Sequence, residues 1–190
     1  MSVFEFSNIL WSILFSLAFA QILAGLAGLI QAGRRVRWSP LHAVWLTSIF
    51  ICVVANWISV WGLRDLPTWT TGYIVLLLVA MFLQYLACFL ALPNVSNDGS
   101  IDLEAFHNEQ RGRYLGAFAL LNGISIPLNV VTSELFGVSA WGWQNIAQAP
   151  AAVLTFAAIF FRQRWLDWTL ALIVLGLSGF YLLGLQDTIG

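Results

Sequence analysis

Residues 69–92 read WTTGYIVLLLVAMFLQYLACFLAL, a run that contains no charged side chain. In an α-helix that rises 1.5 Å per residue, about 20 such residues cross roughly 30 Å of hydrocarbon. Comparable apolar runs lie on both sides of it, at 7–31, 40–63, 113–134, 143–161 and 165–186. The sequence therefore predicts an all-α integral membrane protein, built as a bundle of six transmembrane helices.

The composition agrees with this prediction. The chain is 60% hydrophobic and 9% charged, with a mean hydropathy of +0.84, as in proteins that cross a membrane several times. Six spans leave little for a soluble part, so we expect a single transmembrane domain, residues 1–190, in contact with the lipid bilayer. A net charge of −1 and the lack of a basic, aromatic-rich stretch argue against nucleic-acid binding. The predicted location is the inner (plasma) membrane of a bacterium.

The arginines predict how the bundle is oriented. All eight basic residues are arginine, and seven of them lie in three connections. These are Arg34, Arg35 and Arg37 before the second run, Arg111 and Arg113 before the fourth, and Arg162 and Arg164 before the sixth. Cytoplasmic loops collect positive charge, so we expect these connections in the cytoplasm and both termini on the extracytoplasmic side.

The only sizeable loop, residues 93–112, is acidic and leads into the fourth span. Its first half has turn-forming residues, and Ser100 is placed to cap a helix whose first turn contains Asp102 and Glu104. We expect this helix to continue into the fourth span. The acidic side chains either remain solvated or bind a partner.

Small residues recur at every fourth position of the first run, at Ser12, Ser16, Ala20, Ala24 and Gly28. Such a ridge lets another backbone approach closely, which is a main source of helix association in lipid. We expect the ridge to pack closely, in the first place against a helix of the same chain and alternatively against a second copy. A homo-oligomer or a complex with other membrane subunits is predicted in addition.

Polar residues follow one side of the second, fourth and fifth runs. They are Ser48 and Asn56 in the second, Asn122, Ser125 and Asn129 in the fourth, and Gln144, Gln148 and Thr155 in the fifth. Polar groups that face acyl chains are costly, so these sides should face each other or water. They either line a polar cavity or pore, or form hydrogen bonds that hold the helices together.

Two prolines lie within these spans. Pro127 and Pro150 each remove one backbone hydrogen bond, which predicts kinks in the fourth and fifth helices. Carbonyl groups freed at membrane depth are tolerated where protein or water satisfies them, and interrupted helices often mark binding sites in transporters.

Residues that are missing restrict the chemistry. Without lysine there is no Schiff base, and with His42 and His107 as the only histidines too few ligands converge, so we expect no cofactor and no metal. No acidic or basic residue lies near the centre of a run, which disfavours a proton relay. No set of catalytic residues is recognisable, and an enzyme is not expected.

The polar sides are the strongest functional lead. They favour a channel or an uncoupled permease for a small neutral or weakly charged solute, with a path along the second, fourth and fifth helices. The alternative is a non-catalytic accessory or scaffold subunit of a larger membrane complex.

Overall fold

The computed structural model describes residues 2–95, 99–137 and 143–185. The described residues are almost entirely helical, in agreement with the predicted all-α class. The α-helices are α1 (Val3–Ala32), α2 (Pro40–Trp61), α3 (Thr71–Leu90), α4 (Leu103–Leu135), α5 (Trp143–Phe160) and α6 (Arg164–Leu183). Short 3-10 turns, η1 (Gly33–Arg35) and η2 (Gly62–Asp65), follow α1 and α2, and β1 (Val36–Arg37) pairs in parallel with β2 (Ile101–Asp102).

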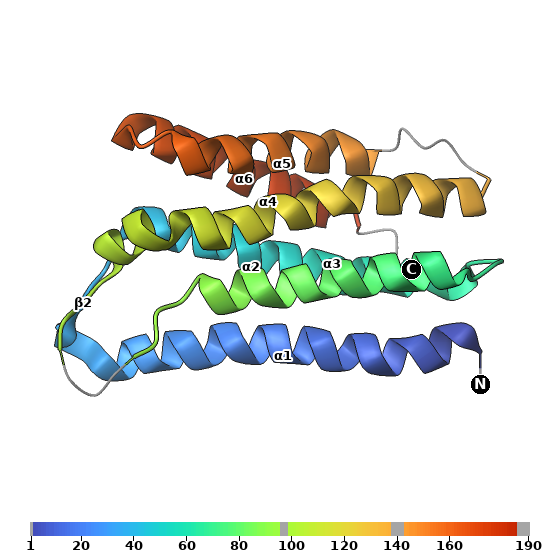
Figure 1. Ribbon diagram of the computed structural model, residues 1–190, viewed down its shortest axis with the longest axis horizontal. Coiled ribbons are helices and arrows are strands. Elements are labelled where there is room, and N and C mark those ends of the chain that lie inside the picture. Colours follow the sequence, from blue (N-terminus) through green and yellow to red (C-terminus); the bar gives the residue numbers. More distant parts are fainter. Residues whose placement is uncertain (1, 96–98, 138–142, 186–190) are drawn as a thin grey trace.

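The helices form a ring rather than a row of sequential hairpins. In Figure 1, α1, α3, α4 and α5 lie side by side, and α2 and α6 lie behind them. The principal contacts run from α1 to α3, α4, α5, α6 and α2, and α2 returns to α1. This order brings polar residues of several helices to the inside of the ring.

The three arginine-bearing connections lie at the same end of the bundle, which we call the arginine end (Figure 1). There, Arg37 Nη1 donates to Asp102 Oδ2 at 3.0 Å, and Arg111 Nη2 donates to the Phe161 carbonyl at 2.9 Å. The start of α1 and the end of α6 lie at the opposite end. The side of the membrane that each end faces stays a prediction.

Within the described residues, five helices are long and apolar enough to cross a membrane. They are α1 to α4 and α6, and they support the placement of this chain in a membrane. The apolar part of α5 is shorter, so a sixth complete span stays a prediction. Pro127 and Pro150 lie inside helices that continue on both sides of them, and the expected kinks also stay predictions.

The small-residue ridge of α1 lies away from the centre of the bundle. Ser12, Ser16, Ala20 and Ala24 are exposed, and only Gly28 is half-buried, against Val95. The buried side of α1 carries several larger residues instead, namely Trp11, Phe15, Ile22 and Leu29. Large side chains fill the space inside the ring, which small residues would leave open. Contact with a second copy through the ridge stays a prediction.

The fourth helix begins two residues later than the Ser100 cap implied. Asp102 is its N-cap, and Asp102 Oδ1 accepts from the backbone N–H groups of Glu104 and Ala105. Aspartate is an equally good cap, and the salt bridge to Arg37 fixes it in this position. The expected continuation of this helix into the fourth span is confirmed. Residues 96–98 of the acidic loop lie outside the described part of the chain.

Candidate functional site

A cavity of about 280 Å³ lies inside the ring, toward the end opposite the arginines. Every one of the six described helices contributes at least one lining residue, from Phe15 on α1 to Tyr181 on α6. The lining reaches the helix ends at Phe136 and Leu185. At about 30 Å³ per water, the volume equals the share of roughly nine water molecules in the liquid. A compact organic solute therefore fits.

Five of the polar residues singled out in the sequence line this cavity, and three do not. The five are Asn56, Ser125, Asn129, Gln144 and Gln148. Ser48 is fully buried and donates to the Val44 carbonyl, and Asn122 donates to the Phe118 carbonyl. Thr155 is also fully buried, and its hydroxyl has no partner among the described residues. The structure thus brings polar residues of α2, α4 and α5 to one cavity, whereas their role in permeation stays a prediction.

Carboxamides form the wall between α4 and α5. Asn129 Nδ2 donates to Asn145 Oδ1 at 3.0 Å and to Gln148 Oε1 at 2.9 Å. On the other side of α4, the hydroxyls of Tyr73 and Thr132 are 2.6 Å apart, which joins α3 to α4. The two possibilities raised by the sequence therefore occur together, because the same side chains both hold helices together and line the cavity.

Among the carboxamides of the wall, Gln84 on α3 was not predicted from the sequence. Its side chain is 2% exposed, and its Oε1 accepts from Asn56 Nδ2 at 2.7 Å. Gln84 is the only carboxamide in an otherwise apolar helix, so no repeated polar positions marked it. Leu77, Ala80 and Ala87 lie on the same side of α3 as Gln84 and are buried. The signal available in the sequence was a polar residue at the helical spacing of these apolar residues.

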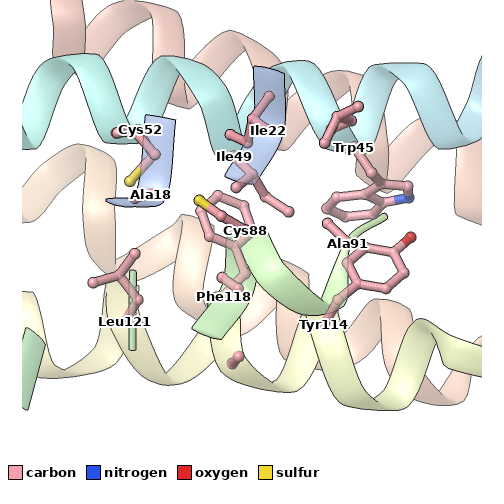
Figure 2. Close-up of a cluster of buried hydrophobic side chains, with 14 of the residues drawn as sticks. Ala18, Ile22, Trp45, Ile49, Cys52, Cys88, Ala91, Tyr114, Phe118 and Leu121 are labelled. Atoms are coloured by element: carbon pink, nitrogen blue, oxygen red, sulfur yellow. The ribbon is translucent and has the colours of Figure 1, made fainter. Parts of the chain in front are cut away.

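A tightly packed apolar layer (Figure 2) lies on the arginine side of the cavity, because its residues precede the lining residues along α2 and α4. It contains Ile49 and Cys52 of α2, Cys88 of α3, and Phe118 and Leu121 of α4, none of them more than 6% exposed. Leu121 also lines the cavity and so marks its floor. Figure 2 shows the indole nitrogen of Trp45 and the hydroxyl of Tyr114 at one end of this layer.

Beyond the layer, Asp167 lies in a buried polar cluster at the arginine end. Asp167 Oδ1 accepts from Trp45 Nε1 at 3.2 Å, and Oδ2 lies 3.0 Å from His107 Nε2 and 2.9 Å from Arg111 Nη2. The side chains of His107, Arg111 and Asp167 are at most 4% exposed. Asp167 also occupies the first turn of α6, where a negative charge is favourable.

His107 connects Asp167 to Tyr114. A carboxylate accepts hydrogen bonds, so His107 Nε2 donates to Asp167, and His107 Nδ1 lies 2.5 Å from the Tyr114 hydroxyl. Arg111 links the cluster to α5, because its Nη2 also donates to the carbonyls of Ala158 and Phe161. A cation at the end of a helix satisfies carbonyls that have no partner within that helix. The cluster thus ties α2, α4, α5 and α6 together.

The cluster brings together residues that are remote in sequence. The ring centres of His42 and His107 lie 6.2 Å apart, and Arg111 and Asp167 are buried although they lie near helix ends. Part of the cluster could be predicted from the sequence, because His107, Arg111 and Tyr114 lie four and three residues apart on one side of a helix. Their partner Asp167 is remote in sequence and gave no such signal. Within residues 2–95, 99–137 and 143–185, no group of three or more metal-binding side chains occurs.

No protein family, curated protein or solved structure matches this chain. A functional proposal therefore depends on the geometry of the cavity and of the cluster.

Proposed function

We propose that this chain is a permease that carries a small neutral solute across the membrane without coupling to an ion. The cavity is the observation on which this proposal depends. Its described lining consists of carboxamides, hydroxyls and apolar side chains, with no Asp, Glu, Lys, Arg, His or Cys among them. Concave sites that combine apolar walls with a few oriented polar groups are typical of small-molecule binding. A lining without charged or histidine side chains favours binding and passage over catalysis.

The apolar layer supports a permease rather than an open channel. Ile49, Phe118 and Leu121 are 1% exposed or less and are packed together (Figure 2), and Leu121 borders the cavity. A solute that enters from the far end must wait until this layer parts, and carriers with a central site work by such alternating access. The predicted orientation makes the cavity accessible from the extracytoplasmic side.

The proposal is tested by solute uptake into liposomes that contain the purified protein. Glycerol, urea and acetamide are suitable first probes, with protein-free liposomes as the control. We expect uptake of at least one neutral solute that saturates with concentration, together with no ion current. Uptake that rises linearly without saturation would instead indicate a channel. Absence of uptake for a broad panel of solutes, with folded protein, would contradict both the permease and the channel.

The accessory-subunit alternative is favoured by one observation, the exposed small-residue ridge of α1. Ser12, Ser16, Ala20 and Ala24 present an open stretch of small side chains on the outside of the ring. We expect native mass spectrometry from mild detergent to show a homo-oligomer or a bound membrane subunit. Monomers without a partner under several gentle conditions would remove the support for this alternative.

A further inference from the structure

A groove of about 390 Å³ runs along the outside of the ring between α1 and α2. On α1 it extends from Phe4 to Phe15, about 17 Å of helix at 1.5 Å per residue. α1 packs mainly against α3 and much less against α2, so the two helices leave this space between them. Trp57 and Trp61 of α2 line the groove and are exposed. Because α1 and α2 are long and apolar enough to cross a membrane, the groove opens toward acyl chains.

Phe15 and Val60 line both this groove and the cavity inside the ring. Among the described residues, they are the only two that belong to both linings. Phe15 is 5% exposed and Val60 is 8% exposed, so their side chains fill the space where the groove and the cavity meet. Side chains change position by rotation between staggered conformations, without movement of the backbone. Two apolar side chains therefore form the boundary between the cavity and the lipid side of the ring.

The two linings limit which molecules can pass this boundary. The groove is lined by aromatic and aliphatic side chains together with Asn8 and Ser12, which lie four residues apart on one side of α1. Neither the groove nor the cavity has a charged side chain among its described lining residues. A charged solute would lose its hydration without gaining a partner of opposite charge. A neutral molecule with an apolar body and one polar group finds suitable contacts in both spaces.

We propose that the groove is a lateral entrance, through which a neutral amphiphilic molecule dissolved in the bilayer reaches the cavity past Phe15 and Val60. A medium-chain alcohol or amide represents this class of solute. The inference rests on the proposed function, since it specifies which solutes the permease takes up and from where. Displacement of the Phe15 ring opens the boundary, and its return closes the cavity toward the lipid.

Thiol labelling of the purified protein in lipid nanodiscs tests this entrance. The cavity residue Ser125 is replaced by cysteine in a variant without Cys52 and Cys88. Two maleimides serve as probes: N-butylmaleimide dissolves in the bilayer, and a sulfonated maleimide stays in the water. We expect Phe15→Ala to speed the reaction with N-butylmaleimide about fivefold, because a packed ring no longer has to leave its rotamer. The reaction with the sulfonated maleimide should stay nearly unchanged. Acceleration of both reactions alike, of the sulfonated probe alone, or of neither would overturn the entrance.

Leu17→Ala is the matched control on the same helix. Leu17 is 49% exposed and lines neither the groove nor the cavity, so its truncation should leave both reactions unchanged. An acceleration by Leu17→Ala as large as that by Phe15→Ala would attribute the effect to a general loosening of α1 and reject the entrance. If Phe15→Ala does not fold, Val60→Ala is a smaller truncation at the same boundary and should act in the same direction.

A cysteine in the groove shows whether the groove is open to the bilayer. Ser12 lines the groove and is exposed, so we expect N-butylmaleimide to modify Ser12→Cys in the variant without Cys52 and Cys88. Protection of this cysteine would indicate that a second copy of the chain covers the groove, and the entrance would be rejected.

Labelling requires no gradient and so does not depend on transport. Faster labelling of the cavity in Phe15→Ala combined with no uptake into liposomes would reject the permease and retain the entrance. Uptake of a solute combined with no effect of Phe15→Ala on labelling would do the opposite.

Discussion

The two ends of the ring use polar residues in opposite ways. Toward one end, uncharged carboxamides and hydroxyls surround a cavity of about 280 Å³. At the arginine end, Asp167, His107 and Arg111 are packed against each other, and each is bonded to at least two other groups. A buried charge is tolerated only when it is paired and hydrogen-bonded, and Asp167, His107 and Arg111 pair with one another in this way. The uncharged amides instead border a space that a solute can fill.

The difference predicts that the cluster mainly supports the fold and that the cavity mainly supports function. Asp167 connects α6 to Trp45 of α2 and to two residues of α4. In contrast, Asn129 connects only α4 and α5. Substitutions at the two ends should therefore separate stability from transport.

The largest expected effect is that of Asp167→Ala. It leaves Arg111 buried without its counterion and removes acceptors from Trp45 and His107, so we expect a loss of about 3–5 kcal/mol of stability. Thermal unfolding in detergent measures this loss. Asp65→Ala is the matched control, because Asp65 pairs with Arg64 but its side chain is 73% exposed. A change at Asp167 no larger than that at Asp65 would show that the cluster does not hold the helices together.

A smaller effect on stability and a larger effect on transport are expected for Asn129→Leu. The substitution removes two hydrogen bonds between α4 and α5, which in a membrane amounts to about 1 kcal/mol. It also covers polar surface of the cavity, so we expect uptake into liposomes to fall by more than half. Asn122→Leu is the control on the same helix, because Asn122 is buried outside the cavity lining. Equal loss of uptake in both variants would remove the distinction between lining and packing carboxamides.

The smallest effect concerns Asp102, at the surface of the arginine end. The hydrogen bond from the backbone N–H of Ala105 is the largest cause that lowers the pKa of Asp102. The backbone N–H of Glu104 and the guanidinium of Arg37 also lower it. A lowered pKa in the folded state contributes stability that is present above the ordinary aspartate value of about 3.9 and is lost as the pH falls through the folded-state pKa.

We therefore expect Asp102→Ala to lower the thermal stability slightly at neutral pH and by less in strong acid, where the protonated Asp102 still caps the helix but carries no charge. Asp102→Asn should lose less, because asparagine still caps the helix and only the charge is removed. Thermal unfolding at both pH values checks this. A destabilisation by Asp102→Ala that is as large in acid as at neutral pH would exclude the charge as its cause.

Much of the fold could be predicted from local sequence, whereas the arrangement of the helices could not. Apolar runs identify helices because each span must be apolar over its own length, and 69–92 contains α3 almost residue for residue. The ring order depends on contacts between remote residues, such as that between Trp45 and Asp167. The small-residue ridge of α1 is mostly exposed, because a small side chain permits close packing but does not determine which side of a helix is buried.

The candidate site could likewise be predicted only in part. Asn129 and Gln148 belong to polar stripes that helical periodicity reveals, and both line the cavity. Ser48, Asn122 and Thr155 lie on the same stripes but at other depths or angles, where they are buried in packed regions. Gln84 is a single polar residue without a repeat, so only the three-dimensional contacts place it beside Asn56.

The most direct test of the central claim compares the reactivity of two buried serines replaced by cysteine. Ser125 lines the cavity, Ser48 is packed outside it, and each hydroxyl donates to the carbonyl four residues earlier on its own helix. In a variant without Cys52 and Cys88, a small membrane-impermeant thiol reagent added from the side on which α1 begins should label Ser125→Cys and leave Ser48→Cys unmodified. Equal labelling of both positions, or labelling of Ser48→Cys alone, would contradict a solute-accessible cavity at this end of the ring.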